Sequence, residues 1–352
     1  REDITLIVAT GTHPPMTPDE FPQILPQEII SRYRVVSHDA EDKGILREVG
    51  TTSRGTPLLL NRLFLDADVR IVIGNIEPHQ FMGFSGGVKS AVIGLAAKET
   101  INQNHAMMSL PEALPGRYED NPPRQDVEEM GEMVRIDLAV NAILNDKKEI
   151  IEVTAGVPAA VMRQGIPRVR RLYELEVRPP FDLVIASPGG HPKDINVYQS
   201  QKALAHASLV TKEGGGIVVT AACPEGSGSE SYEEWVAERT SHRQVISDFE
   251  VEGFRVGPHK AFQVARETVR FRTRWVSDMP SQLAAKLLLP TADGVETAVR
   301  ELLDEVADDR AGGTEGPSAP GVENAGARET PRVGIMPIAN ATIATIGGRN
   351  IQ

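Results

Sequence analysis

Two imidazoles and a lysine stand close together in one glycine-rich stretch of the sequence. His79 follows an apolar run at residues 69–73, Lys89 follows the turn Gly-Phe-Ser-Gly-Gly at residues 83–87, and His105 ends the stretch. Histidine exchanges protons near neutral pH and also binds metals. The backbone amides of a glycine-rich turn at the start of a helix can cradle an anion. The stretch therefore predicts a site that combines proton transfer with the binding of an anionic group.

The glycine-rich turn invites comparison with the P-loop of nucleoside triphosphatases, G-x-x-x-x-G-K-[ST]. The lysine and the serine after it fit, but Val88 stands where the pattern needs glycine. The preceding strand also ends several residues too early for a P-loop. The sequence therefore argues against a triphosphatase, and the expectation that remains is that Ser85, Gly86 and Gly87 hold an anionic part of some ligand.

A third histidine lies in a loop after another predicted strand. The apolar run at residues 4–9 is typical of a parallel strand covered on both faces, and Thr10, Gly11 and His13 follow it. Ligands of open α/β sheets bind at the carboxyl ends of the strands. Because His13, His79 and His105 all fall in loop-like stretches, we expect them to act jointly rather than as isolated histidines.

A second polar cluster begins at residue 198. Tyr198, Gln199 and Lys202 are spaced so that they share one face of a predicted helix. A cation, an amide and a phenol together suit a small carboxylate that carries a hydroxyl group. The alternative is an exposed amphipathic helix with an ordinary surface lysine. His259 and Lys260, which follow Gly-Pro, are weaker candidates still.

The alternation of strands and helices predicts an α/β fold with mostly parallel sheets. A chain of 352 residues favours two domains, and the stiff linker Arg-Pro-Pro that begins at residue 178 divides it into residues 1–177 and 178–352. Residues 311–328 read as a flexible insert, after which the last strand could return to either domain. Predicted strands lie at residues 4–9, 33–37, 69–73, 138–143, 149–153, 181–186, 217–221 and 333–337, and predicted helices at residues 90–97, 125–133, 157–174, 196–208, 231–237, 261–268 and 297–306.

Composition excludes several classes of partner. The net charge of −12 argues against nucleic acids and anionic membranes, and no apolar run reaches the length of a membrane span. The single cysteine, Cys223, excludes an internal disulfide and reads as a buried thiol, which fits a cytoplasmic protein. Because the chain opens almost directly on a strand, we expect further residues upstream.

Several motifs resemble those of the lactate racemase family. They are Ala-Thr-Gly-Thr-His at residues 9–13, Glu-Pro-His through Phe-Ser-Gly-Gly-Val-Lys at residues 77–89, Asn-His at residues 104–105, Gly-Gly-His-Pro-Lys-Asp at residues 189–194 and Tyr-Gln-x-x-Lys at residues 198–202. The resemblance implies two α/β domains with the active site between them. It also implies a nickel-pincer nucleotide, supplied by cofactor-synthesis enzymes, and a small 2-hydroxy acid as substrate.

The resemblance also implies a role for each candidate residue. Lys89 would form a covalent thioamide tether to the cofactor, and His105 would be a nickel ligand. His13 and His79 would be the acid–base pair. Tyr198, Gln199 and Lys202 would bind the substrate carboxylate and hydroxyl. The residues around the cofactor would be Thr10, Gly11, Ser85, Gly86 and Gly87.

The sequence departs from the family pattern in two places. Family members carry an upstream Asp-x-Thr-Arg segment whose arginine helps to hold the substrate, and this sequence begins after that point. His259 stands where the lactate enzymes tend to have a tryptophan, which implies a more polar pocket and a substrate larger than lactate. Two alternatives stay open, namely a zinc hydrolase with His13, His79 and His105 as ligands, and a non-catalytic protein that binds a nucleotide or an acid.

Overall fold

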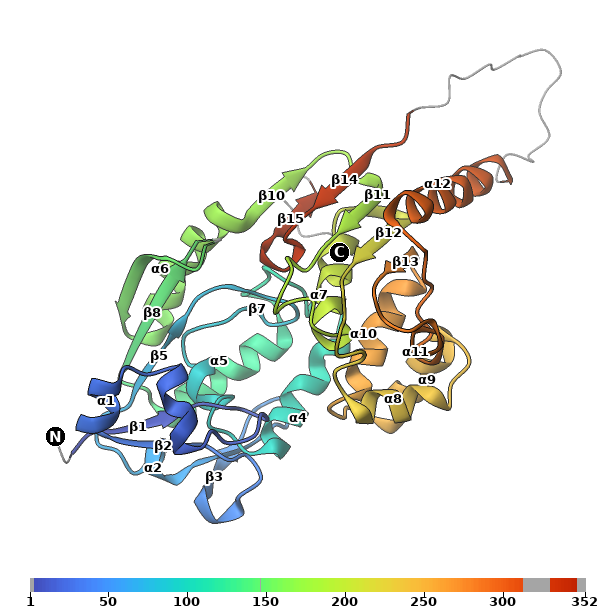
Figure 1. Cartoon of the computed structure of the whole chain (residues 1–352). Helices are drawn as coiled ribbons and strands as arrows, with labels where there is room; N and C mark the ends of the chain where they lie inside the picture. The colour runs from blue at the N-terminus through green and yellow to red at the C-terminus, as the bar shows by residue number, and fades with distance from the viewer. Residues whose placement is uncertain (1–2, 146, 313–329, 347–352) are drawn as a thin grey trace. The chain divides into compact units, whose positions relative to one another are not determined.

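The computed structural model describes residues 3–145, 147–312 and 330–346, and the chain forms two compact units (Figure 1). The first unit comprises residues 1–173 and the second residues 174–351. Most of the predicted insert at residues 311–328 lies outside the described residues. Among the residues described, no helix is both long and apolar enough to span a membrane.

The first unit contains small sheets rather than one large sheet. Two strand pairs run parallel, β1 (Thr5–Val8) with β2 (Arg34–Ser37) and β5 (Ile71–Asn75) with β8 (Leu138–Leu144). β9 (Ile150–Gly156) is an exception to the mostly parallel pairing that was predicted: it runs antiparallel to β8 because the connection between them is too short for a crossover. Two antiparallel hairpins complete the unit: β3 (Leu46–Thr51) with β4 (Pro57–Asn61), and β6 (Pro78–His79) with β7 (Gly83–Phe84).

The helices of the first unit agree with prediction at residues 125–133 and 157–174 but not at residues 90–97. The small-residue helix there ends at Val92, and Ala97 instead donates its N–H to the carbonyl of Leu59 at 2.9 Å. Strand-like contacts with β4 thus compete successfully with helix propensity. The helices are α1 (Gln27–Arg32), α2 (Arg62–Leu65), α3 (Lys89–Val92), α4 (Lys98–Ala106), α5 (Pro122–Val134) and α6 (Pro158–Tyr173), with 3₁₀ turns η1 (Pro18–Gln23), η2 (Lys43–Ile45) and η3 (Met107–Ser109).

One face of the β5–β8–β9 sheet is apolar and exposed. α6 packs against β8 and β9, and Val72 of β5 is buried. Its neighbours Ile71 and Ile73 are 48% and 76% exposed, because successive strand residues point to opposite faces. β1 is likewise only half-buried or exposed. The prediction that the strand at residues 4–9 is covered on both faces is therefore wrong within the described residues.

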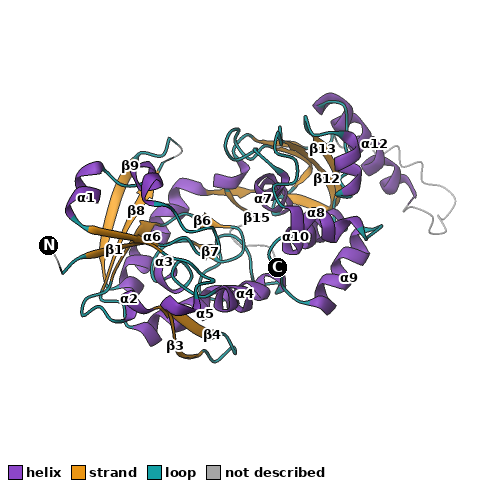
Figure 2. Cartoon of the chain, turned by 60° about the horizontal axis from the view of Figure 1, so that its bottom comes forward, coloured by secondary structure: helices purple, strands orange, loops and turns teal. Residues whose placement is uncertain are grey.

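The second unit is built on a four-stranded parallel sheet of order β13–β12–β11–β14, whose four strands are labelled in Figure 1, with β12 and β13 labelled again in Figure 2. The strand predicted at residues 333–337 joins this sheet as β14, so the alternative that it returns to the first unit is wrong. A separate parallel pair joins β10 (Glu174–Val177) to β15 (Ile343–Ile346). The sheet strands are β11 (Phe181–Ala186), β12 (Thr211–Thr220), β13 (Arg272–Val276) and β14 (Val333–Met336), and the helices are α7 (Val197–Ser208), α8 (Glu230–Ala237), α9 (His242–Glu252), α10 (Pro258–Thr268), α11 (Ser281–Lys286) and α12 (Val295–Gly312), with the turn η4 (Ala339–Ala341).

Helices cover both faces of this parallel sheet. On one face Leu183 of β11 and Val218 of β12 cluster with Leu302 of α12. On the other face Val184 and Val219 belong to the larger core, in which α7 packs on the sheet and α10 packs on α7. Because side chains alternate along a strand, the continuous apolar runs predicted here are buried on both sides.

The order of the strands marks the edge where a ligand would bind. From β11 the chain proceeds to β12 and β13 on one side, and then returns to β14 on the other side of β11. The carboxyl ends of β11 and β14 therefore form a topological switch point, which is where ligands bind in open α/β sheets. The loop after β11 leads directly into α7, so the first turn of α7 lies at this edge.

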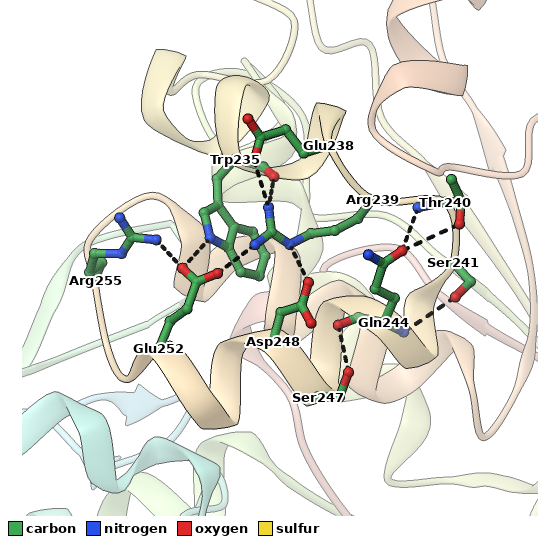
Figure 3. A network of polar contacts seen from close by, with 10 residues as sticks. All are labelled: Trp235, Glu238, Arg239, Thr240, Ser241, Gln244, Ser247, Asp248, Glu252 and Arg255. Carbon is green, nitrogen blue, oxygen red and sulfur yellow. Dashed lines mark hydrogen bonds and ion pairs between the residues drawn. The ribbon is translucent and has the colours of Figure 1, made fainter.

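A buried arginine joins α8 to α9 in the second unit (Figure 3). The Arg239 side chain is 5% exposed, and its guanidinium lies over the ring of Trp235, 3.5 Å from the centroid. It pairs with Asp248 at 3.2 Å and donates to the Glu252 carboxylate at 2.6 Å. The indole of Trp235 donates to the same carboxylate at 2.8 Å. Arg239 thus links α8 to α9 through ion pairs and hydrogen bonds.

His206 of α7 makes the stability of the second unit depend on pH. Its Nδ1 lies 2.7 Å from the carbonyl of Thr342, and burial lowers the pKa of the ring from 6.5 to about 4. In the unfolded chain the ring takes up its proton at higher pH, so stability falls as pH drops from about 6.5 to about 4. The gap between these two pKa values corresponds to roughly 3 kcal/mol.

We expect His206→Gln to remove most of this loss between pH 6.5 and pH 4. Both tryptophans, Trp235 and Trp275, lie in the second unit, so urea unfolding followed by their fluorescence reports on that unit. A smaller slope should remain, because burial also lowers the pKa of His242. A variant whose stability falls with acid as steeply as the wild type would show that His206 is not the responsible group.

Candidate active site

The β6–β7 hairpin and the turn after it fold back onto the end of β5. The hydroxyl of Ser85 donates to the carbonyl of Asn75 at 3.0 Å, and its backbone N–H donates to the carbonyl of Glu77 at 2.9 Å. These bonds fix the hairpin that carries His79 and the turn that precedes Lys89. The local fold thus holds an imidazole and a lysine at the carboxyl end of a parallel strand, the edge predicted for ligand binding.

His79 and His105 gather round one aromatic ring. The ring of Phe81 lies edge-on to that of His79, with centroids 4.8 Å apart, and edge-on to that of His105, with centroids 5.1 Å apart. The N–H of Met82 donates to Nδ1 of His79 at 3.2 Å. Nδ1 of His79 is therefore the acceptor in the neutral ring, and the proton lies on Nε2. Sequence reasoning missed Phe81, although it stands only two residues after His79.

The placement of these histidines in loops was wrong for two of the three. His79 belongs to β6, and His105 lies in the last turn of α4. The preceding Asn104 anchors α4 to α5, because its amide donates to the Asp126 carboxylate at 2.8 Å. His13 does lie in a loop and is exposed. Within the described residues no three His, Cys, Asp or Glu side chains are grouped to hold a metal, so the structure adds no support to the alternative of a three-histidine zinc site.

The glycine-rich turn is held from inside the unit. The N–H of Gly87 donates to Oδ1 of Asn141 at 2.9 Å, so this amide already has a partner. The fully buried guanidinium of Arg124 donates to the carbonyls of Phe84 and Gly86 at 3.1 and 3.2 Å. Arg124 also donates to Glu128 at 2.8 Å. The turn is therefore held in a fixed conformation at the start of α3. Arg124, which the sequence did not single out, donates most of the side-chain hydrogen bonds that hold it.

Gly83→Ala is expected to disrupt this support. Gly83 has a φ of +69°, and a Cβ there would lie 1.5 Å from the backbone oxygen of Arg117. Left-handed strain and the backbone clash together should cost roughly 2–5 kcal/mol of stability. Gly55→Ala is the matched control, because Gly55 has a φ of +82° but open space around it. Urea unfolding followed by circular dichroism compares the two variants, and equal losses would refute the clash.

Thr10 and Gly11 fix the loop that presents His13. The Thr10 hydroxyl donates to the carbonyl of His38 at 2.9 Å, and the N–H of Gly11 donates to the carbonyl of Gly94 at 3.0 Å. His38 is fully buried, and its Nε2 lies 2.9 Å from the carbonyl of Ala96. Burial lowers the pKa of His38, so it remains a neutral structural residue. These contacts give Thr10 and Gly11 a positioning role.

The second polar cluster is assembled within the second unit as the spacing predicted. Asn196 caps α7 by accepting from the N–H of Gln199 at 3.1 Å. Nζ of Lys202 donates to Oε1 of Gln199 at 2.8 Å. The ring of Tyr198 lies edge-on to that of His259, with centroids 5.6 Å apart. Because most of α7 is buried, the alternative of an exposed amphipathic helix is wrong.

Two further residues of this unit complete the comparison with prediction. Cys223 is buried, as expected, and its Sγ lies 3.6 Å from the Ser200 hydroxyl. Lys260, which is only a weak candidate in the sequence, lies with its Nζ 4.5 Å from the centroid of the Tyr198 ring. A lysine next to a histidine in a helix start looks ordinary in sequence, and only the packing of α10 on α7 brings it to the cluster.

Comparisons with known proteins identify the family. Residues 1–114 match the model of the lactate racemase N-terminal domain, and residues 177–311 match that of the lactate racemase C-terminal domain. The chain belongs to the lactate racemase family. It is 30% identical over 247 residues to the lactate racemase of Thermoanaerobacterium thermosaccharolyticum, which is 70% of this chain and 58% of that protein. It is 32% identical over 231 residues to the lactate racemase of Lactiplantibacillus plantarum, or 65% and 54% of the two chains.

The match thus spans little more than half the length of these lactate racemases. Two solved structures share the fold. The lactate racemase apoprotein of Thermoanaerobacterium thermosaccharolyticum has a TM-score of 0.86 at 24% identity and covers 97% of this chain and 78% of that one. A protein from Thermotoga maritima has a TM-score of 0.68 at 17% identity, with 97% and 85% covered. The fold predicted from the sequence, α/β in two parts, is confirmed.

Proposed function

We propose that this chain is a racemase or epimerase of a small 2-hydroxy acid. The observation that carries the proposal is the contact between Lys202 and Gln199 in the first half of α7, beside the Tyr198 phenol. These groups are those needed to hold a carboxylate and a hydroxyl, and they stand at the sheet edge where ligands bind. Membership of the lactate racemase family supports the same reaction class.

Inversion at Cα follows from an oxidation and its reversal. The hydroxyl proton passes to a base, while the Cα hydrogen leaves with its electron pair. The product is a 2-keto acid whose ketone group carries no charge. Return of the hydride to the opposite face of the ketone carbon, and of a proton to the ketone oxygen, then yields the other enantiomer. We assign the acid–base work to His13 and His79, one for each enantiomer, because imidazole exchanges protons near neutral pH. Lys202 keeps the carboxylate in place while the ketone turns.

The reaction needs a hydride acceptor, and the residues of the first unit fit a nickel-pincer nucleotide. Imidazole is a suitable nickel ligand, which gives His105 that role, and the amine of Lys89 can form a covalent thioamide. Nδ2 of Asn141 is buried beside the glycine-rich turn and has no partner among the described residues, so an acceptor group there would satisfy it. Ser85, Gly86 and Gly87 would then support the group mainly by placing Lys89. When bound, the group would supply an electrophilic carbon that takes the Cα hydrogen with its electrons and returns it.

The supply of this group implies partners, because it must be made elsewhere and attached. We therefore infer that the chain depends on cofactor-synthesis enzymes. A single buried cysteine fits a reducing compartment, and we place the protein in the cytoplasm on that ground.

Racemisation of defined acids tests the proposal. The chain is co-expressed with the cofactor-making enzymes and incubated with single enantiomers of 2-hydroxy acids, and optical rotation is followed to equilibrium. We expect rotation to decay to zero for at least one acid, and Lys202→Met to slow this decay by roughly 10–100-fold through loss of a charge-assisted bond. Binding of acids without any decay of rotation would instead indicate a non-catalytic acid-binding protein.

A further inference from the structure

Lys260 is a buried cation beside the proposed carboxylate-binding group of the second unit. Its side chain is only 2% exposed, and its Nζ donates to Oε1 of Gln263 at 2.9 Å. The same Nζ lies over the Tyr198 ring, 4.5 Å from the centroid. His259, its neighbour in α10, also contacts that ring. α10 therefore adds a lysine to the face of α7 that carries Tyr198 and Lys202.

No carboxylate balances this charge among the described residues. The contacts of Lys260 are an amide oxygen and an aromatic ring, and neither carries a full negative charge. Buried lysines are rare unless they are paired, because removing an ammonium group from water is costly. Burial and, next, the charge of Lys202 lower the pKa of Lys260 well below its ordinary value. Burial thus disfavours the charged form of Lys260, and a negative group bound beside its Nζ would stabilise that form.

We propose that Lys260 gives this site a second positive charge that selects 2-hydroxy acids with a second carboxylate over those with one. The inference rests on the proposed function, in which Tyr198 and Lys202 hold the first carboxylate and the hydroxyl. Lys260 lies over the ring of Tyr198, and Lys202 follows Tyr198 by four residues on the same face of α7, so an anion held by Lys202 and Tyr198 would be attracted by Lys260 as well. A second carboxylate on the same acid supplies the missing counter-charge.

A purely structural role for Lys260 makes a different prediction. If the lysine served only to pack on Tyr198, its replacement by methionine would leave the ratio of affinities for mono- and dicarboxylic acids unchanged. If the lysine selects a second carboxylate, the ratio of the two affinities falls toward one in this variant. Methionine keeps the length and the apolar stem of lysine, and replacing an unpaired buried charge by a hydrophobic residue is neutral or stabilising. We therefore expect Lys260→Met to fold and to unfold at the same or a higher temperature than the wild type.

Equilibrium binding to the full chain, measured by calorimetry with L-malate and L-lactate, tests the inference. The two acids share the 2-hydroxy-acid head and differ in the second carboxylate. We expect the wild type to bind malate roughly tenfold or more tightly than lactate, the scale of one partly buried charge-assisted bond. Lys260→Met should reduce this preference to about twofold or less, whereas Lys286→Met, a control on the exposed lysine of α11, should retain it.

Each outcome separates this inference from the function on which it rests. Equal affinity of the wild type for both acids, or an unchanged preference in Lys260→Met, overturns the role of Lys260 and leaves the carboxylate-binding group intact. Binding of neither acid overturns both. Racemisation of lactate by a cofactor-loaded chain that shows no preference for malate would support the proposed function and contradict the selection by Lys260.

Discussion

Replacement of Lys89 by alanine is expected to abolish racemisation, with a rate reduced by at least about four orders of magnitude. In the proposed mechanism the Cα hydrogen must leave with its electron pair, and no side chain of the chain can accept it. Without the lysine the hydride acceptor has no covalent anchor and is lost from the protein. The measurement is the initial rate of loss of optical rotation with the chain produced beside the cofactor-making enzymes.

A second lysine of the first unit provides the control. Lys98 opens α4, and its Nζ lies 2.5 Å from an exposed carboxylate oxygen of Glu41. Exposed pairs of this kind contribute little to stability, so Lys98→Ala should keep its fold and its rate within about twofold. Full activity in Lys89→Ala would show that the reaction does not depend on a lysine tether.

Arg239→Ala is expected to cost the second unit roughly 3 kcal/mol of stability, the lower end for a broken buried ion pair. The substitution removes the guanidinium from Glu252 and Asp248 and takes the cation from the face of Trp235. Because both carboxylates keep partial access to water, the cost should not reach the upper end of that range.

Arg255→Ala is a matched control for this prediction. Arg255 also pairs with Glu252, but its side chain is 54% exposed, so its loss should cost less than about 1 kcal/mol. Urea unfolding followed by tryptophan fluorescence compares both variants with the wild type. Equal losses of unfolding free energy would mean that the buried position of Arg239 does not matter, which would contradict its role in linking α8 to α9.

The elements with strong periodicity could be predicted from the sequence, and those set by tertiary pairing could not. α5, α6 and α7 lie within a few residues of their predicted bounds, because their apolar spacing fits a helix. Residues 95–97 are the good helix formers Leu-Ala-Ala, but they pair with β4 instead. Local propensity is a weak guide wherever a backbone partner is close.

The same distinction between local spacing and tertiary contacts holds for the candidate site. The spacing of Gln199 and Lys202 sufficed to predict their contact, because both lie on one helix. Phe81 between His79 and His105 could not be predicted, since β6 and α4 are brought together by contacts distant in sequence. Lys260 could be only a weak candidate for the same reason, because its partner Tyr198 belongs to another helix.

Peptide mass spectrometry of the wild-type chain produced beside the cofactor-making enzymes tests the central claim most directly. We expect a covalent adduct on the peptide that contains Lys89, unmodified lysine at Lys98, and nickel that accompanies the adduct. An actively racemising preparation in which Lys89 is unmodified would contradict this claim.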